Sequence, residues 1–375
     1  MTMGESSRES QALRDLLVDS AKRIFADHNT RAAGEAAENG TWPARLWEEI
    51  EAAGLSAAAR STDRGGVDTD FADVAALVRV AGRMAVPLPL AETFLAEQLL
   101  AAAGLAPADG PATVGPVLPG DAPELTKDGA GWRLDGTLHR VPWARDAGTL
   151  IVLAKHGNRW ATVRIDEPRR YVTRPAANVA REPRDTVRFD NLSVDADRVS
   201  LEGSFKADQL LERGAFFRCL QMAGALEEVL ELTVRYANER VQFGKPIGKF
   251  QAVQHQAAVL ASHAAASSAA AHGALEALRR SQGTEIALEV MLAKIRIGEA
   301  SGIAAAIAHQ VHGAMGFTYE HVLHRSTRRL WSWRDEFGAE AHWAEQAGRL
   351  VSQTGGEGLW AYLTSPRDSR RALGT

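Results

Sequence analysis

The feature that most constrains the fold is a change of hydrophobic period, which occurs twice along the chain. Residues 11–105 repeat apolar side chains at helical spacing, whereas residues 106–130 contain too many prolines and glycines for a helix. Residues 131–194 then alternate apolar and polar side chains as half-buried strands do, and after Gly203 the helical period returns. The sequence therefore predicts an α+β chain in which helices, a β module and a helical bundle follow one another.

Two segments carry the prediction for the β module and the bundle. The run TLIVLAKHGNRWATVRI (149–165) contains two β-rich stretches around His-Gly-Asn-Arg, which is typical of a hairpin. Three long helical stretches are expected after it, at 206–242, 248–280 and 284–313, with Thr284 as an N-cap. Their alanine-rich faces favour closely packed helices.

Composition excludes several classes of function. The chain has 43 Lys+Arg against 47 Asp+Glu, a net charge of −4, so it has no general basic field for nucleic acid or an anionic membrane. The N-terminus lacks the apolar core of a signal peptide, and no segment is apolar enough for a membrane span. A single cysteine, Cys219, lies in an apolar stretch and is expected to be a buried thiol. We expect a cytoplasmic protein without a metal site.

One helix ends in an unusual way. Residues 239–251 read ERVQFGKPIGKFQ, and the breakers Gly244, Pro246 and Gly248 stop a helix that restarts at once. A helix end needs only a glycine and a proline beyond it. This one also displays a cation, an amide and an aromatic ring, which are Arg240, Gln242 and Phe243. The simplest interpretation is a helix C-cap with a solvated arginine.

Two motifs resemble the acyl-CoA dehydrogenase family. YANERVQFGKPIGKFQAVQHQAA (236–258) is similar to the family's R-x-Q-F-G-x-P-I…F-Q signature, and QVHGAMGFTYEH (310–321) is similar to its Q-x-H-G-G-x-G-x-T-x-E element. The resemblance implies an α+β multidomain fold with an N-terminal α-helical domain (1–111), a middle β-barrel or sandwich domain (112–205) and a C-terminal four-helix bundle (206–375). It also implies FAD as cofactor, an acyl-CoA substrate and an electron-transferring flavoprotein as electron acceptor.

In this family the residues of both motifs reach the FAD of a neighbouring subunit. By resemblance, Arg240 would pair with the pyrophosphate, for which a fork of donors is suited. Gln242 and Gln251 would add amide hydrogen bonds, and Phe243 an apolar wall. The second motif would place a side chain and a close backbone along the same cofactor, through Gln310, Gly313 and Gly316.

The resemblance fails at the catalytic base. Most family members place a glutamate before a glycine after the second motif, and a minority place it on the helix before the first motif. Gap-free counting puts Phe337 and Gly214 at these two positions, so both are empty. The displaced carboxylates Glu336 and Glu212 are the remaining candidates, although a shift along a helix turns a side chain to another face. The simpler interpretation is a surface carboxylate, with Glu336 pairing Arg334 or Arg328.

The β module also lacks the family's T-E-P-x-x-G-S-D element, and RVPWARDAG (140–148) replaces W-I-T-N. The chain keeps the residues that would contact a neighbour's FAD, but it lacks motifs of its own flavin pocket. In this it resembles the subunits of bacterial heteromeric (α2β2) acyl-CoA dehydrogenases of steroid side-chain degradation. The alternatives are a self-sufficient homotetramer with a relocated base, a flavin monooxygenase of the same fold, and a structural subunit without cofactor.

Overall fold

In the computed structural model, helices occupy the first hundred residues. The structure describes residues 3–355 and 360, apart from 68, 119, 204 and 281–287. The N-terminal helices are α1 (Met3–His28), α2 (Arg31–Glu38), α3 (Ala44–Ala52), α4 (Phe71–Arg83) and α5 (Leu90–Ala102). A capping box fixes the start of α4, because Asp70 and Asp73 each accept the other's backbone N–H.

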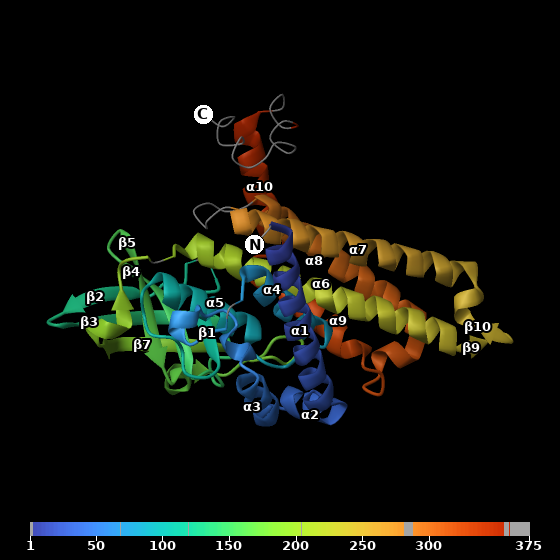
Figure 1. Ribbon diagram of the computed structural model, residues 1–375, viewed down its shortest axis with the longest axis horizontal. Coiled ribbons are helices and arrows are strands. Elements are labelled where there is room, and N and C mark those ends of the chain that lie inside the picture. Colours follow the sequence, from blue (N-terminus) through green and yellow to red (C-terminus); the bar gives the residue numbers. More distant parts are fainter. Residues whose placement is uncertain are drawn as a thin grey trace.

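A mixed sheet follows α5 and lies at one end of the molecule (Figure 1). Its strands are β1 (Ala112–Gly115), β2 (Glu124–Asp128), β3 (Gly131–Pro142), β4 (Thr149–His156), β5 (Arg159–Asp166), β6 (Val172–Arg174), β7 (Arg184–Val194) and β8 (Val199–Ser200). The order is β6-β7-β3-β2-β4-β5-β8, with β1 parallel to β4. The inward side chains of these strands form a core of their own.

Long helices form most of the described chain after β8. They are α6 (Ala207–Glu239), α7 (Gln251–Arg280), α8 (Leu288–His312), α9 (Leu323–Asp335) and α10 (Glu340–Thr354). A small hairpin, β9 (Val241–Gln242) with β10 (Lys245–Pro246), joins α6 to α7. It projects from the end of the bundle opposite the sheet (Figure 1). None of the described helices combines the length and apolar character that crossing a bilayer requires.

The architecture confirms the predicted order of helices, β module and helical bundle. The expected hairpin is β4–β5, and the thiol of Cys219 is free and buried. The N-cap expected at Thr284 lies outside the described residues. The domain limits at 111 and 205 stay a prediction, although β1 begins at Ala112 and α6 at Ala207.

Two glycines let α4 and α6 touch through their backbones. A Cβ on Gly82 would lie 2.3 Å from the carbonyl oxygen of Gln221, and a Cβ on Gly224 would lie 2.1 Å from that of Arg79. No L side chain fits at such a distance. This contact between α4 and α6 attaches the N-terminal helices to the bundle.

We therefore expect Gly224→Ala to force α4 and α6 apart and to lower the free energy of unfolding by about 2 kcal/mol or more, in the range of core overpacking. The matched control is Gly273→Ala on α7, where a Cβ meets nothing within 4 Å. That change should stabilise the helix by about 0.5–1 kcal/mol. Denaturant titration of both variants measures the difference, and equal stabilities would contradict the close packing.

Candidate functional site

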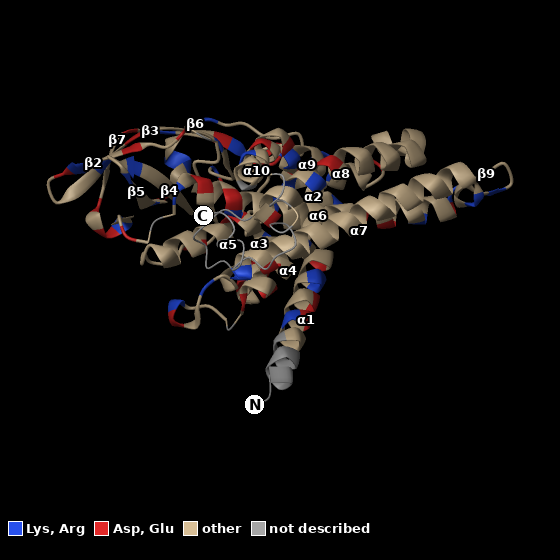
Figure 2. Ribbon diagram, turned by 90° about the horizontal axis from the view of Figure 1, so that it is seen from above, with Lys and Arg blue, Asp and Glu red and all other residues tan. Residues whose placement is uncertain are grey.

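The first motif forms the tip of the projecting hairpin. Phe243 and Gly244 are the two turn residues, with φ of 53° and 78°, as a two-residue hairpin loop with left-handed residues requires. The side chain of Phe243 is 90% exposed, and Arg240 and Gln242 are exposed beside it. Lysines at 245 and 249 add to the positive charge of this tip (Figure 2). An exposed aromatic ring among cations is typical of a contact surface.

The second motif lies at the same end of the bundle. Gln310 is exposed on the last turn of α8, and Gly313, with φ 58°, begins the 3-10 turn Gly313–Phe317. The rings of Tyr236, near the end of α6, and His312, the last residue of α8, stack at 4.4 Å. The structure thus brings Gln310 and Gly313 to the end that carries the hairpin, where Gln251 begins α7.

A cavity with mainly apolar walls lies elsewhere, between the sheet and α9. It has a volume of about 320 Å³, which is in the range of small-molecule sites. Apolar side chains dominate its walls: Val117, Leu118, Pro142, Val179, Trp331 and Phe337. Pro142, in the segment that replaces W-I-T-N, is thus a wall of the cavity, whereas the next residue, Trp143, is buried edge to face against Trp42 at 6.4 Å.

The hairpin cannot reach this cavity. The guanidinium of Arg218 on α6 binds Glu336 in the cavity wall, and Arg240 lies 22 residues further along, at the C-cap of the same helix. At 1.5 Å per residue this separates the two arginines by roughly 33 Å. Any ligand that Arg240 holds therefore lies outside this chain's own cavity.

The two positions that sequence counting assigned to the base meet in space. A Cβ on Gly214 would lie 2.0 Å from Cδ1 of Phe337, so the phenyl ring occupies the volume next to Gly214. Phe337 itself is 3% exposed and has a φ of 53°. A carboxylate from either position would need the volume that this ring takes, and the cavity has an apolar wall there instead.

Glu336 points into an ion-pair network. Arg184 donates to its two oxygens at 2.7 and 2.9 Å, Arg218 donates at 2.7 Å, and the amide of Asn178 donates at 3.1 Å. The expectation of a surface carboxylate paired with Arg334 or Arg328 is wrong, because the side chain is only 17% exposed and both its arginine partners are buried. Glu212 is also buried, at 1% exposure, and it does not line the cavity.

These contacts set the protonation state of Glu336. Burial alone would raise the pKa of this carboxyl, but the charges of Arg184 and Arg218 and the hydrogen bonds to Arg184 and Asn178 outweigh it. They lower the pKa from its ordinary 4.5 to about 2. A general base works best with a pKa near the operating pH. Glu336 is therefore a permanent anion with its oxygens engaged, which argues for a structural role.

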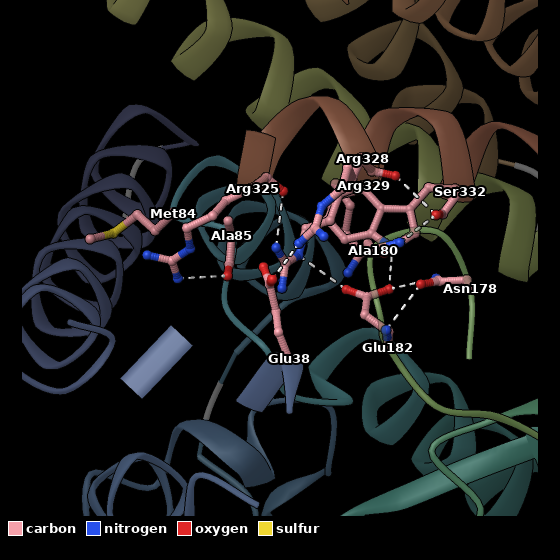
Figure 3. A network of polar contacts seen from close by, with 12 residues as sticks. Glu38, Met84, Ala85, Asn178, Ala180, Glu182, Arg325, Arg328, Arg329 and Ser332 are labelled. Carbon is pink, nitrogen blue, oxygen red and sulfur yellow. Dashed lines mark hydrogen bonds and ion pairs between the residues drawn. The ribbon is translucent and has the colours of Figure 1, made fainter. Parts of the chain in front are cut away.

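The network joins all three parts of the chain. On the far side of Arg218, Glu92 of α5 accepts a hydrogen bond at 2.5 Å. Glu182, in the loop before β7, accepts from Arg184 at 3.0 Å, from Arg329 at 3.1 Å and from the indole of Trp333 at 3.0 Å. Figure 3 shows Arg329 of α9 reaching Glu182, and the neighbouring Arg328 reaching Glu38 of α2. We call Glu92, Glu182, Arg184, Arg218, Arg329 and Glu336 the buried ion-pair network.

The turn after α9 is held from a second side. Lys294 of α8 is completely buried, and its Nζ donates to the carbonyls of Arg334 and Gly338 at 2.5 and 2.7 Å. Burial lowers the pKa of this lysine to about 8. The indole of Trp343 donates to the carbonyl of Phe337 at 3.0 Å. The backbone around Glu336 and Phe337 is therefore fixed by Lys294 and Trp343, which do not line the cavity.

The two regions differ in what they offer to FAD. Within the described chain, none of the buried polar atoms that lack a hydrogen bond belongs to a residue lining the cavity, so its buried polar wall groups are already satisfied. At the hairpin end, Arg240, Gln242, Gln251 and Gln310 form no hydrogen bond or ion pair with another described side chain. Their free donors are of the kind that bind phosphate oxygens.

Sequence reasoning did not identify Glu182, Arg184 or Arg218, which determine the state of the cavity. Only Arg218 gives a signal, as a charged residue within the otherwise apolar stretch AFFRCLQMAG (215–224), whereas Glu182 and Arg184 lie in the charged run REPRD (181–185). Such a pattern indicates burial with a partner and does not name the partner.

Comparison with known proteins gives consistent results. Residues 203–340 match the family described as acyl-CoA dehydrogenase, C-terminal domain. Acyl-CoA dehydrogenase IpdE2 of Mycobacterium tuberculosis is 29% identical over 84% of this chain and 90% of that protein. A variant of the Tcur3481–Tcur3483 steroid ACAD has a TM-score of 0.80 at 24% identity, covering 94% of this chain and 99% of that one. The ChsE4–ChsE5 complex from M. tuberculosis has a TM-score of 0.80 at 22% identity, covering 90% and 97%.

Replacing Glu336 by Gln should remove an anion and leave two buried arginines undercompensated. We expect the free energy of unfolding at pH 7 to fall by about 3 kcal/mol, the lower end of the cost of breaking a buried pair. Because the folded-state pKa is depressed, the wild type keeps this contribution above pH 4.5 and loses it as the pH falls to about 2.

The control for this change is Glu345→Gln, which breaks only an exposed i,i+4 pair with Arg349. Such pairs contribute about 1 kcal/mol at most. Urea titrations between pH 3 and 7 would show the free energies of unfolding of the two variants moving apart as the pH rises. Identical curves would contradict the role assigned to the buried ion-pair network.

Proposed function

We propose that this chain is a member of the acyl-CoA dehydrogenase family, as the match of residues 203–340 supports, and that it is a subunit of an FAD-dependent acyl-CoA dehydrogenase that completes the flavin site of a homologous partner. Members of this family desaturate acyl-CoA thioesters at the α,β-carbons. The bound FAD supplies the acceptor for the hydride that leaves the β-carbon. The residues of this chain that serve the site are those of the projecting hairpin and of the end of α8.

One observation carries the proposal, namely the separation between the free polar residues and the chain's own cavity. Arg240 is exposed at the end of the bundle, roughly 33 Å along α6 from Arg218, the residue that binds Glu336 in the cavity wall. It can bind a cofactor only outside this chain's cavity, and Gln310 is exposed at the same end of the bundle. Arg240 would neutralise the pyrophosphate with two parallel hydrogen bonds, while Gln242, Gln251 and Gln310 would fix its position.

The partner would supply the base. In this chain the aromatic ring of Phe337 fills the volume beside Gly214, and the neighbouring carboxylate of Glu336 is held by two guanidinium groups. A carboxylate with a pKa of about 2 is a weak proton acceptor toward the α-carbon of a thioester. We infer that the reacting end of the acyl group meets a glutamate of the other subunit.

The comparisons support a heteromer and a bulky substrate without deciding either. Two solved structures of similar fold carry two-component names, Tcur3481–Tcur3483 and ChsE4–ChsE5, and the first is described as a steroid ACAD. We propose a heterotetramer with a homologous chain and a steroid-derived acyl-CoA substrate. By family resemblance, an electron-transferring flavoprotein would reoxidise the flavin.

The visible spectrum distinguishes the heteromer from its alternatives. We expect the purified chain alone to be colourless or poorly soluble, and the co-expressed pair with a base-bearing homologue to show flavin absorbance. Flavin bound stoichiometrically by the chain alone would contradict the proposal and favour a homotetramer or a flavin monooxygenase. In the pair, Arg240→Ala should release flavin, whereas Arg280→Ala at the other end of α7 should not.

A second experiment tests the relocated base. In the flavin-loaded pair, Glu336→Gln should leave the rate of dehydrogenation within about twofold of the wild type once folding is confirmed, because no proton would pass through this side chain. The base-bearing glutamate of the partner, changed to Gln, is the positive control and should abolish turnover. A loss of several orders of magnitude from Glu336→Gln would instead establish Glu336 as the base.

A further inference from the structure

The segment Gln310–Phe317, which resembles the family's second FAD-contacting motif, packs against buried histidines. Gln310 and Gly313 are exposed, but their neighbours His309 and His312 are 6% and 2% exposed. The chain thus turns a polar face outward and buries an imidazole one residue before Gln310. Burial of a polar ring at such a point requires a reason, because an apolar side chain would pack at lower cost.

His309 is fixed on three sides. Its ring stacks on Phe317 at 4.6 Å with an interplanar angle of 28°, and on Trp331 at 5.6 Å with an angle of 17°. Its Nε2 lies 3.0 Å from Oγ1 of Thr327 on α9. The Thr327 hydroxyl also lies 3.4 Å from the carbonyl of Leu323, so it connects the ring to the backbone of α9.

The turn after Gln310 closes onto this ring. A Cβ on Gly316 would lie 2.9 Å from Cβ of His312 and 3.3 Å from Nδ1 of His309. The absence of a side chain at Gly316 is therefore required by the histidines of the same chain. A Cβ on Gly313 would meet nothing within 4 Å, and this residue keeps its left-handed φ at the helix end. Gly313 therefore has open space beside its backbone, whereas Gly316 is packed against the two histidines.

We propose that His309 is the positioning residue of this segment. As a neutral ring between Phe317 and Trp331, it fixes the course of the turn from Gln310 to Phe317 and so the direction of the Gln310 amide. Burial lowers the pKa of His309 and favours this neutral state. The inference rests on the proposed function, because it concerns how the segment meets the partner's FAD. His309 touches no reacting atom and acts through Gln310.

Packing alone is the competing explanation, and it differs in what a substitution would change. A ring that only fills space affects the stability of the chain and leaves the affinity for FAD constant. A ring that positions Gln310 affects the affinity for FAD even where the assembly remains folded. The hydrogen bond between His309 and Thr327 and the two stacking contacts can be removed separately.

The experiment uses the assembly that binds flavin, stripped of FAD and titrated with FAD while the quenching of flavin fluorescence is followed. We expect His309→Ala to raise the dissociation constant at least tenfold. His309→Phe keeps a flat ring between Phe317 and Trp331 and should stay within about threefold of the wild type. Thr327→Val, nearly isosteric, should raise the constant about two- to fivefold. Thermal unfolding of each apo-assembly is recorded in parallel.

Unchanged FAD affinity in both His309→Ala and Thr327→Val would overturn the inference, whatever their melting temperatures. If His309→Ala fails to assemble, Thr327→Val and His309→Phe decide alone, and equal affinity in Thr327→Val and the wild type would overturn it. Gln310→Ala and Arg240→Ala serve as references. If they weaken FAD binding and the His309 and Thr327 variants do not, only this inference fails. If the reference variants also leave FAD binding unchanged, the proposed function fails.

Discussion

The pairing of Glu336 with Arg184 and Arg218 is the interaction on which the rest of the structure depends. It brings a strand of the β module, the longest helix of the bundle and the end of α9 to one buried point, and Glu92 connects α5 to it. Three anions and three cations compensate one another within the buried ion-pair network. Such a network is costly to leave incomplete. The same contacts that hold the domains together occupy the carboxylate nearest to the position of a catalytic base.

In the proposed function, the two ends of α6 have different roles. Near its beginning, Gly214 and Phe337 close the place of a base with an aromatic ring, and the polar groups around the cavity satisfy one another. At its far end, Arg240 and Phe243 of the hairpin region are exposed and available to a binding partner. A long straight helix separates the two regions, so one can lose its chemistry while the other keeps its binding residues.

The order of helices and strands could be predicted because hydrophobic period and turn residues act locally. The two motifs that resemble the family's FAD-contacting elements could also be recognised, because Arg240 and Gln310 each lie in a contiguous segment. The partners of Glu336 could not, since Arg184 and Arg218 come from distant elements that only the fold brings together. The same holds for Gly316, whose sequence context suggests a ligand contact while the space beside it is taken by His309 and His312.

The most direct test of the account is an experimental structure of the flavin-loaded assembly. The account predicts that the guanidinium of Arg240 lies within about 3 Å of a pyrophosphate oxygen of an FAD whose ring is seated in the partner's β module. A flavin ring seated in this chain's own cavity, against Pro142 and Phe337 and with a carboxylate of this chain above it, would contradict the account.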